Sequence, residues 1–248
     1  MRYFIQLSFD GTPFHGWQIQ KNAQSVQDEI QQALSTILRL PIEITGAGRT
    51  DAQVHAKMMV AHFDHDSAIE DLKKLVFKVN SLLPNSIAIQ KIVGVPSDLH
   101  ARFSATARSY EYHIHQEKNP FKVERSYYYN QELDVEKMNT AAKVLFEYED
   151  FSCFSKSHTQ TFTNNCEIKL ARWEVEADGL VFHITANRFL RNMVRAIVGT
   201  LLEIGSGKLE INDLHRIIRS KNRSLAGTSV PACGLYLSWV EYPIQPFN

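Results

Sequence analysis

GAGRTDAQVHA, residues 46–56, is the stretch on which the interpretation of this sequence depends. A β-branched run at 42–45 leads into it and an alternating apolar segment at 54–63 leads away, which predicts a loop between two strands. Two glycines in three residues permit a tight turn with close backbone approach. The turn would display Asp51, with Arg49 near enough to keep its carboxylate ionised. An aspartate that only caps a glycine-rich turn is the alternative.

The composition is typical of a soluble globular protein. The chain has 248 residues, of which 44% are apolar and 22% charged, which suits one large or two modest domains. The sequence shows no signal-peptide run and no apolar span of membrane length. Cys153, Cys166 and Cys233 lack metal-ligand spacing, so we interpret them as reduced, small hydrophobic residues of a cytoplasmic protein.

Hydrophobic periodicity predicts an α+β chain with two similar domains, 1–103 and 104–248. Strands are expected at 3–9, 42–45, 54–64, 86–95, 106–115, 167–177, 180–186 and 235–242, with a hairpin turn at Asp178-Gly179. Helices are expected at 25–40, capped by Ser25, at 67–83, at 134–146, at 189–204, and at 213–220, capped by Asn212. Residues 147–166 are expected to be a loop.

The formal net charge is zero, which by itself does not favour a nucleic-acid partner. The charges are nevertheless unevenly distributed along the chain. Arginines crowd 188–195 and 216–223, and acidic residues crowd 132–150. A positive surface for phosphates therefore remains compatible with the sequence.

Five blocks resemble motifs of the tRNA pseudouridine synthase A family, in that family's order. GRTDAQVHA resembles its GRTDAGVHA signature. The other blocks are DGT at 10–12 with GWQIQ at 16–20 and SVQ at 25–27, RFSATARSYEY at 102–112, NRFLRNMVRAIVGT at 187–200, and GLYL at 234–237. Gln53, Asp28 and the run at 57–59 depart from the pattern. Gln53 replaces a usual glycine, which raises the question of a left-handed backbone there.

The resemblance implies a fold, an activity and partners. The fold is α+β, with two similar domains whose antiparallel-rich sheets join around a central active-site cleft. The activity is the isomerisation of uridine to pseudouridine at positions 38, 39 and 40 of the tRNA anticodon stem-loop, without a cofactor. The partners are tRNA and a second copy of the chain in a homodimer. Asp51 would be the nucleophile, attacking either the ribose or the base.

The resemblance also implies roles for other residues. Arg195 would pair with Asp51 and lower the pKa of its carboxyl group, the alternative being a helix-surface charge. Tyr110 would contact the target base, although a sheet-face aromatic is equally consistent with the pattern. The remaining candidates are Arg108, Arg188 and Arg191 as RNA contacts, Leu235 as a wall of the base pocket, and Trp17 and Gln18 as a loop tip that packs or contacts RNA.

Three other functions remain open at this point. One is a related synthase with another RNA target, and a second is a non-catalytic RNA-binding or chaperone protein on the same scaffold. The third is a metal hydrolase using His62, Asp64, His65 and Asp66, of which His62 and Asp64 share a strand face. Their spacing matches no zinc motif, so no metal site is predicted.

Overall fold

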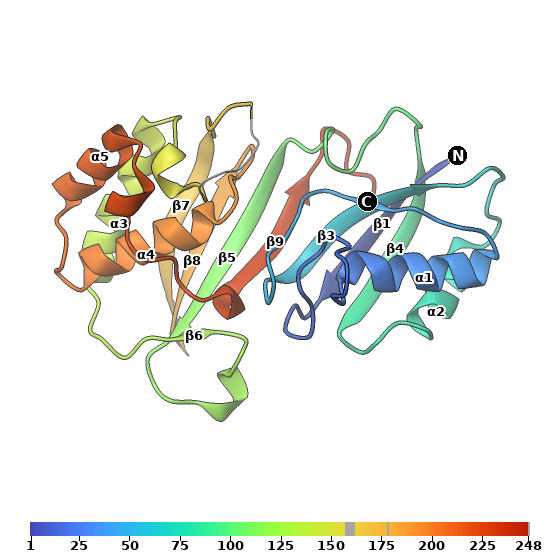
Figure 1. The fold of residues 1–248 in the computed structure, drawn as a ribbon, viewed down its shortest axis with the longest axis horizontal. Helices are drawn as coiled ribbons and strands as arrows, with labels where there is room; N and C mark the ends of the chain where they lie inside the picture. The colour runs from blue at the N-terminus through green and yellow to red at the C-terminus, as the bar shows by residue number, and fades with distance from the viewer. Residues whose placement is uncertain (157–161, 178, 248) are drawn as a thin grey trace. The chain divides into compact units, whose positions relative to one another are not determined.

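The computed structural model describes residues 1–156, 162–177 and 179–247. The chain divides into two compact units (Figure 1). Unit 1 comprises Met1–Thr106 and Tyr236–Asn248, and unit 2 comprises Ala107–Leu235. The C-terminal residues, which the sequence assigned to the second domain, thus pack in unit 1. The functional domains at 1–103 and 104–248 stay a prediction.

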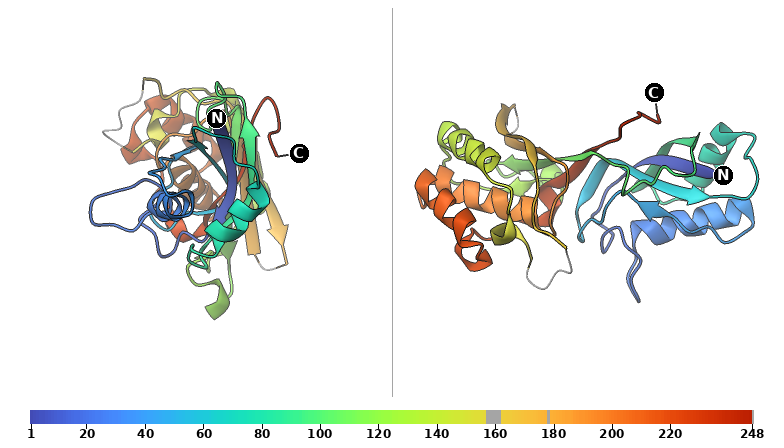
Figure 2. Two further views of the ribbon diagram at one scale, coloured as in Figure 1. Left: turned by 90° about the vertical axis from the view of Figure 1, so that its right-hand side faces the viewer. Right: turned by 90° about the horizontal axis from the view of Figure 1, so that it is seen from above.

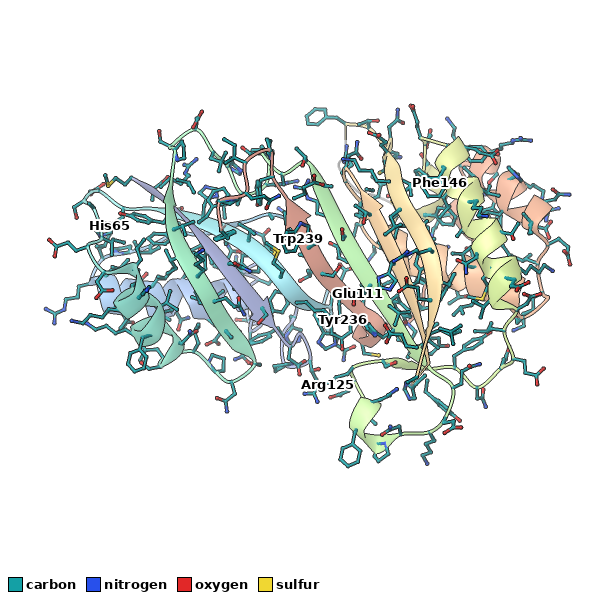
Figure 3. The ribbon with its side chains drawn as sticks, turned by 180° about the vertical axis from the view of Figure 1, so that it is seen from behind. His65, Glu111, Arg125, Phe146, Tyr236 and Trp239 are labelled. Carbon is teal, nitrogen blue, oxygen red and sulfur yellow. The ribbon has the colours of Figure 1, made fainter. Side chains whose placement is uncertain are left out.

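Unit 1 is a mostly antiparallel sheet with two helices. Its strand order is β4-β1-β3-β9, and β2 also pairs with β3. The strands are β1 Arg2–Phe9, β2 Thr45–Gly46, β3 His55–Asp64, β4 Ile87–Val95 and β9 Leu235–Glu241, and the helices are α1 Val26–Leu38 and α2 Leu72–Asn80. β1 runs antiparallel to β3 and β4, whereas β9 joins β3 in parallel through His55↔Tyr236 and Ala56↔Leu237. Figure 3 labels Tyr236 and Trp239 on β9.

Helix α1 forms as the sequence predicts. The Ser25 side chain caps it by accepting a hydrogen bond from the Asp28 amide at 3.3 Å. Its buried residues, Val26, Ile30, Ala33 and Leu34, recur at helical spacing and pack into the core of the unit. The connection from β1 to α1 projects away from that helix (Figure 2). This projecting connection contacts the Asp51 loop, as described below.

Unit 2 has a second antiparallel-rich sheet, of order β5-β8-β7, with β6 parallel to β5. The elements are β5 Ala107–His115, β6 Tyr127–Tyr128, β7 Ile168–Glu176, β8 Gly179–Ala186, α3 Val135–Val144, α4 Met193–Gly205 and α5 Ile211–Ser220, with short 3-10 turns at 120–122, 145–147, 152–154, 223–225 and 232–234. The predicted hairpin is confirmed by the antiparallel β7–β8 pair, although Asp178 of its turn lies outside the described residues. Both units mix helices with antiparallel-rich sheets, so the α+β class is confirmed.

Several predicted boundaries are wrong, and the helix starts differ because other residues cap them or end them. Helix α4 begins at Met193 instead of Phe189, because Asn192 adopts a left-handed conformation with φ 68°. Helix α2 begins at Leu72, capped by Asp71. Helix α5 is capped by Glu210 in a capping box with Asp213, not by Asn212. The strand expected at 42–45 forms only at Thr45–Gly46.

The cysteines are reduced, as the sequence predicts. Cys153 and Cys166 are buried and unbridged, and burial raises their thiol pKa values to about 12 and about 11. Such thiols are poor nucleophiles at neutral pH. Among the described helices, none combines the length and the apolar character that crossing a bilayer requires.

Candidate active site

The Asp51 loop joins β2 to β3 and is held by main-chain contacts. The Trp17 amide donates to the Thr50 carbonyl at 3.3 Å, and the Gln53 amide donates to the Phe14 carbonyl at 3.3 Å. Gly16, at φ 95°, lies so close that an added Cβ would come within 2.3 Å of the Thr50 carbonyl oxygen. The projecting connection therefore fixes the backbone on both sides of Asp51, whose side chain is half-buried.

Gln53, which replaces a glycine usual in the resembled family, does adopt a left-handed backbone conformation. The Val54 amide donates to the Asp51 carbonyl at 3.2 Å, which closes a four-residue turn. Gln53 occupies the third position of that turn with φ 65°, the left-handed conformation typical of a type II turn. The chain therefore keeps the turn that a glycine would favour and bears a modest conformational cost, on the order of 1 kcal/mol.

His55 anchors the end of the same loop. Its side chain is almost fully buried, and its Nδ1 accepts the Gly11 amide proton at 3.1 Å. The Asp10 carboxylate also lies 3.1 Å from that nitrogen. The imidazole stacks on Tyr236 of β9 with ring centroids 4.5 Å apart, and Figure 3 labels that tyrosine. These contacts hold the imidazole in one orientation at the end of the Asp51 loop.

The side chains of two neighbours of Asp51 lack polar partners among the described residues. Arg49 is exposed and, within the described residues, makes no hydrogen bond or ion pair, so the expected Arg49–Asp51 pairing is not formed. The buried Thr50 hydroxyl finds no hydrogen-bond partner in the described part of the chain. Leaving a buried hydroxyl without a hydrogen bond costs about 1–3 kcal/mol, so Thr50 is an energetically unfavourable feature next to the candidate nucleophile.

The sequence suggested an exposed loop tip for Trp17, but the residue is buried. It is 2% exposed, and an added Cβ on Gly46 would come within 2.6 Å of its indole ring. The glycine thus makes room for the tryptophan under the strand that leads into the loop. Gln18 beside it is exposed. Packing is therefore the role of Trp17 in this structure.

Arg195 lies on the first turn of α4 in unit 2. Its Nε donates to the Val230 carbonyl at 2.7 Å, and the Val230 amide donates to the Arg195 carbonyl at 3.2 Å. The segment leading to Val230 packs closely on α4, since a Cβ on Gly199 would come within 1.9 Å of the Thr228 carbonyl oxygen. The guanidinium is half-buried and held in one orientation, which suits a positioned cation.

Tyr110 and Tyr112 share one face of β5 but differ in surroundings. Tyr112 is fully buried and donates its hydroxyl proton to the Pro231 carbonyl at 2.8 Å. Tyr110 is partly exposed and packs edge-on against Phe189, with ring centroids 5.1 Å apart. Tyr112 is therefore a core residue, and Tyr110 is the tyrosine available to a ligand.

The other candidates of unit 2 lie near the ends of its strands. Arg108 donates from Nη1 to the carbonyl of Asn187 at 3.1 Å, immediately before Arg188. Arg188 is half-buried and Arg191 exposed, and both precede α4 instead of lying on it. Leu235, 7% exposed, is the first residue of β9.

The arginines of 216–223 are less available than the sequence suggested. Arg216 pairs with Asp213 at 3.0 Å, and Arg223 donates to the Ala226 and Gly227 carbonyls. Arg219 is exposed and has no ion pair among the described residues. Only part of this segment can therefore serve as a positive surface.

The structure uses the residues of the possible metal cluster in other ways. His62 Nδ1 accepts the Ala101 amide proton at 3.3 Å, and Asp64 pairs with Arg2 at 2.8 Å. Over the described ranges, no three His, Cys, Asp or Glu side chains gather closely enough to hold a metal. The hydrolase alternative thus has no observation in its favour.

Sequence reasoning missed the supporting residues Gly11, Gly16, His55 and Phe189. An added Cβ on Gly11 would come within 2.1 Å of the Val54 carbonyl oxygen, so this glycine acts like Gly16. Both glycines stood in a quoted motif, but their partners lie about 35 to 45 positions away. A sequence pattern indicates that a glycine is required there without naming the backbone that approaches it.

The chain has a half-buried carboxylate on a rigid turn and, elsewhere, a positioned arginine and a partly exposed tyrosine. Such a set of groups is typical of a nucleophilic enzyme that acts on an anionic substrate. The comparisons with known proteins specify the class further. The sequence model described as tRNA pseudouridine synthase matches residues 6–104 and 141–243. The chain belongs to this family.

Proteins named tRNA pseudouridine synthase A are similar over nearly the whole chain. The one from Parabacteroides distasonis is 53% identical over 246 residues, covering 99% of this chain and 98% of that protein. The one from Bacteroides fragilis is 53% identical, covering 100% of this chain and 98% of that protein. The more distant one from Bacillus licheniformis is 37% identical, covering 98% of this chain and 99% of that protein.

Proposed function

We propose that this protein converts uridine to pseudouridine in the anticodon stem-loop of tRNA, at positions 38, 39 and 40, with Asp51 as the nucleophile. The observation that carries the proposal is the Asp51 turn, whose backbone is fixed from both sides in a chain of this family. A carboxylate held this way approaches its target with little loss of conformational freedom.

The chemistry requires no cofactor. The bond between N1 of the base and C1′ of the ribose breaks, and a bond between C5 and C1′ forms. The proton on C5 is lost and N1 gains one, so the product is an isomer of the substrate. Asp51 forms a transient covalent bond with the nucleotide and is released unchanged.

Arg195 and Tyr110 act with Asp51 in this proposal. Arg195 pairs with the carboxylate and keeps it ionised in a pocket from which the RNA excludes water. Tyr110 stacks on the target base, and its phenol oxygen relays the C5 proton. The fixed guanidinium of Arg195 and the partial exposure of Tyr110 support these roles.

The uridine lies within a folded tRNA and is swung out of its stack to react. Arg108, Arg188 and Arg191 contact the displaced nucleotide and its phosphates, and Leu235 walls the base pocket. Arg49, exposed beside the nucleophile, contacts a phosphate instead of pairing with Asp51. The two predicted domains enclose the cleft, the protein works as a homodimer, and it acts in the cytoplasm.

The test is to map pseudouridine in tRNA from cells with and without this protein. Loss at positions 38, 39 and 40, restored by the intact gene and not by Asp51→Asn, is the expected result. Loss at other RNA positions would favour the related synthase with a different target. Unchanged pseudouridine everywhere would exclude the activity. Light scattering of the purified protein tests the homodimer.

A further inference from the structure

Residues 96–106 connect β4 to β5 (Figure 1). Arg2 donates to the Leu99 carbonyl at 3.1 Å, and the Tyr242 hydroxyl donates to the Ala101 carbonyl at 2.6 Å. At its end, the Thr106 amide donates to the Glu241 carbonyl at 2.9 Å. Contacts from β1, from the end of β9 and from Tyr242 just after β9 thus immobilise this connection.

His100 shapes the middle of the connection. Its Nδ1 accepts the amide protons of Arg102 and Phe103 at 3.1 and 3.2 Å, and its own amide donates to the Ser104 hydroxyl at 2.9 Å. Burial and the nearby Arg2 and Arg102 lower the pKa of the imidazole, which keeps it a neutral acceptor. The backbone of Phe103 is consequently fixed before any ligand arrives.

Phe103 is 77% exposed on this rigid support. Its ring lies 4.4 Å from that of His100, and the Arg102 guanidinium lies 5.5 Å from its centroid. An exposed phenyl ring forgoes roughly 1.5–3 kcal/mol of burial energy. Its immediate neighbours in sequence, Arg102 and Ser104, are charged and polar, so Phe103 does not belong to an apolar run of the sequence.

We propose that Phe103 and Arg102 form a nucleotide-binding site separate from the Asp51 loop, in which an unpaired base of the RNA stacks on Phe103 and its phosphate meets Arg102. An aromatic ring next to a guanidinium suits a nucleotide, which offers a flat base and a negative charge together. A protein partner would instead require apolar neighbours around the ring. The site rests on the proposed function, because it takes an RNA substrate.

The matched control is Phe146 (Figure 3). It is 48% exposed in the 145–147 turn and is followed by Glu147 in place of an arginine. Both phenylalanines can be truncated on the surface without opening a core cavity. Phe146 therefore tests exposed aromatic character without a neighbouring cation.

The experiment measures the affinity of the full chain for an anticodon stem-loop RNA. Phe103→Ala should weaken binding about tenfold, within the range for one stacked base, and Phe103→Trp should retain it. Phe146→Ala should bind like the wild type. Arg102→Gln should lower the slope of log affinity against log salt by about 0.7–0.9, whereas Phe103→Ala should leave the slope unchanged.

A second measurement reports stacking directly. The fluorescence that the new tryptophan adds to the wild-type signal should be quenched by the RNA in Phe103→Trp and should not change in Phe146→Trp. Wild-type affinity in Phe103→Ala, or equal losses in both alanine variants, would overturn the site. An altered oligomeric state with unchanged RNA affinity would identify a protein interface instead. Stacking without pseudouridine formation by the wild type would refute the proposed function and leave the site intact.

Discussion

The two units fix their loops with opposite chemistry. In unit 1, imidazoles accept backbone protons: His55 from Gly11, His62 from Ala101, and His100 from Arg102 and Phe103. In unit 2, guanidiniums donate to backbone carbonyls, as Arg195 does to Val230, Arg108 to Asn187, and Arg223 to Ala226 and Gly227. In unit 1, Arg2 also donates to a carbonyl, that of Leu99.

This difference predicts different responses to acid. An imidazole accepts at Nδ1 only while that nitrogen is unprotonated, whereas a guanidinium remains charged at any pH a protein survives. Acid should therefore loosen the loops of unit 1 first. The candidate nucleophile lies in the acid-sensitive unit, and most of the candidate cations lie in the other.

Asp51→Asn should reduce pseudouridine formation by at least about 10³-fold, because an amide cannot act as the nucleophile. The affinity for tRNA should stay within about tenfold, since phosphate contacts supply most of the binding. Product formation and filter binding are measured on the same preparation. Substantial product from this variant would show that Asp51 is not the nucleophile. The acid sensitivity of unit 1 would then have no direct link to catalysis.

His62→Gln should flatten the dependence of stability on pH. Burial lowers the pKa of His62 from 6.5 to about 4, with Arg2 contributing. The unfolded chain therefore binds the proton more readily, and the stabilisation by His62, roughly 3 kcal/mol at most, is present above pH 6.5 and lost as the pH falls towards 4.

Urea titrations at several pH values between 4 and 7.5 measure this effect. Arg223→Met, which removes a unit 2 anchor, should lower stability by a similar amount at each pH. Equal pH slopes for the wild type and His62→Gln would contradict the proposed acid sensitivity of unit 1.

Arg195→Met should slow the chemical step about a hundredfold at neutral pH, a loss typical of removing one electrostatic contact. The proposed function pairs this cation with the Asp51 carboxylate, so its removal should slow the reaction of bound tRNA more than it weakens tRNA binding. Single-turnover rates at saturating tRNA, together with filter binding, measure both effects. Arg223→Met is the control for the lost carbonyl contact. A wild-type rate would make Arg195 a structural residue only.

Gln53→Val should destabilise the protein by about 1–2 kcal/mol relative to Gln53→Gly, because a β-branched residue tolerates positive φ poorly. Gln53→Gly itself should be nearly neutral, since relief of strain is offset by the greater freedom of glycine when unfolded. Thermal unfolding measures the difference. If both variants match the wild type, the turn does not constrain this residue.

The local parts of the fold could be predicted from the sequence. The cap at Ser25, the apolar spacing of α1 and the alternation in β7 and β8 are signals within single elements. The start of α4 could not be predicted, because the apolar pattern continues past Asn192 and only its left-handed backbone ends the helix. The pairing of β9 with β3 joins residues about 180 positions apart, beyond any local pattern.

In the candidate site, too, local features could be predicted from the sequence and contacts between distant segments could not. The glycine-rich motif predicted a tight turn, and the replacement of a usual glycine by Gln53 indicated where its backbone is left-handed. The expected Arg49 contact was inferred from closeness in sequence, which does not fix side-chain direction. The burial of Trp17 depends on the missing side chain at Gly46, a contact between segments that no periodicity reports. The roles of Asp51, Tyr110 and Arg195 stay predictions for the experiments above.

The return of the C-terminal residues to unit 1 has a consequence for the order of folding during synthesis. A ribosome completes all of unit 2 before it makes Tyr236 and Leu237, the partners of His55 and Ala56 on β3. Until then, β3, the strand that follows the candidate nucleophile, lacks the neighbour on one of its edges, and His55 lacks the ring on which it stacks. A nascent chain that ends before β9 should thus carry an unfinished Asp51 loop, and activity should appear only after β9 has left the ribosome.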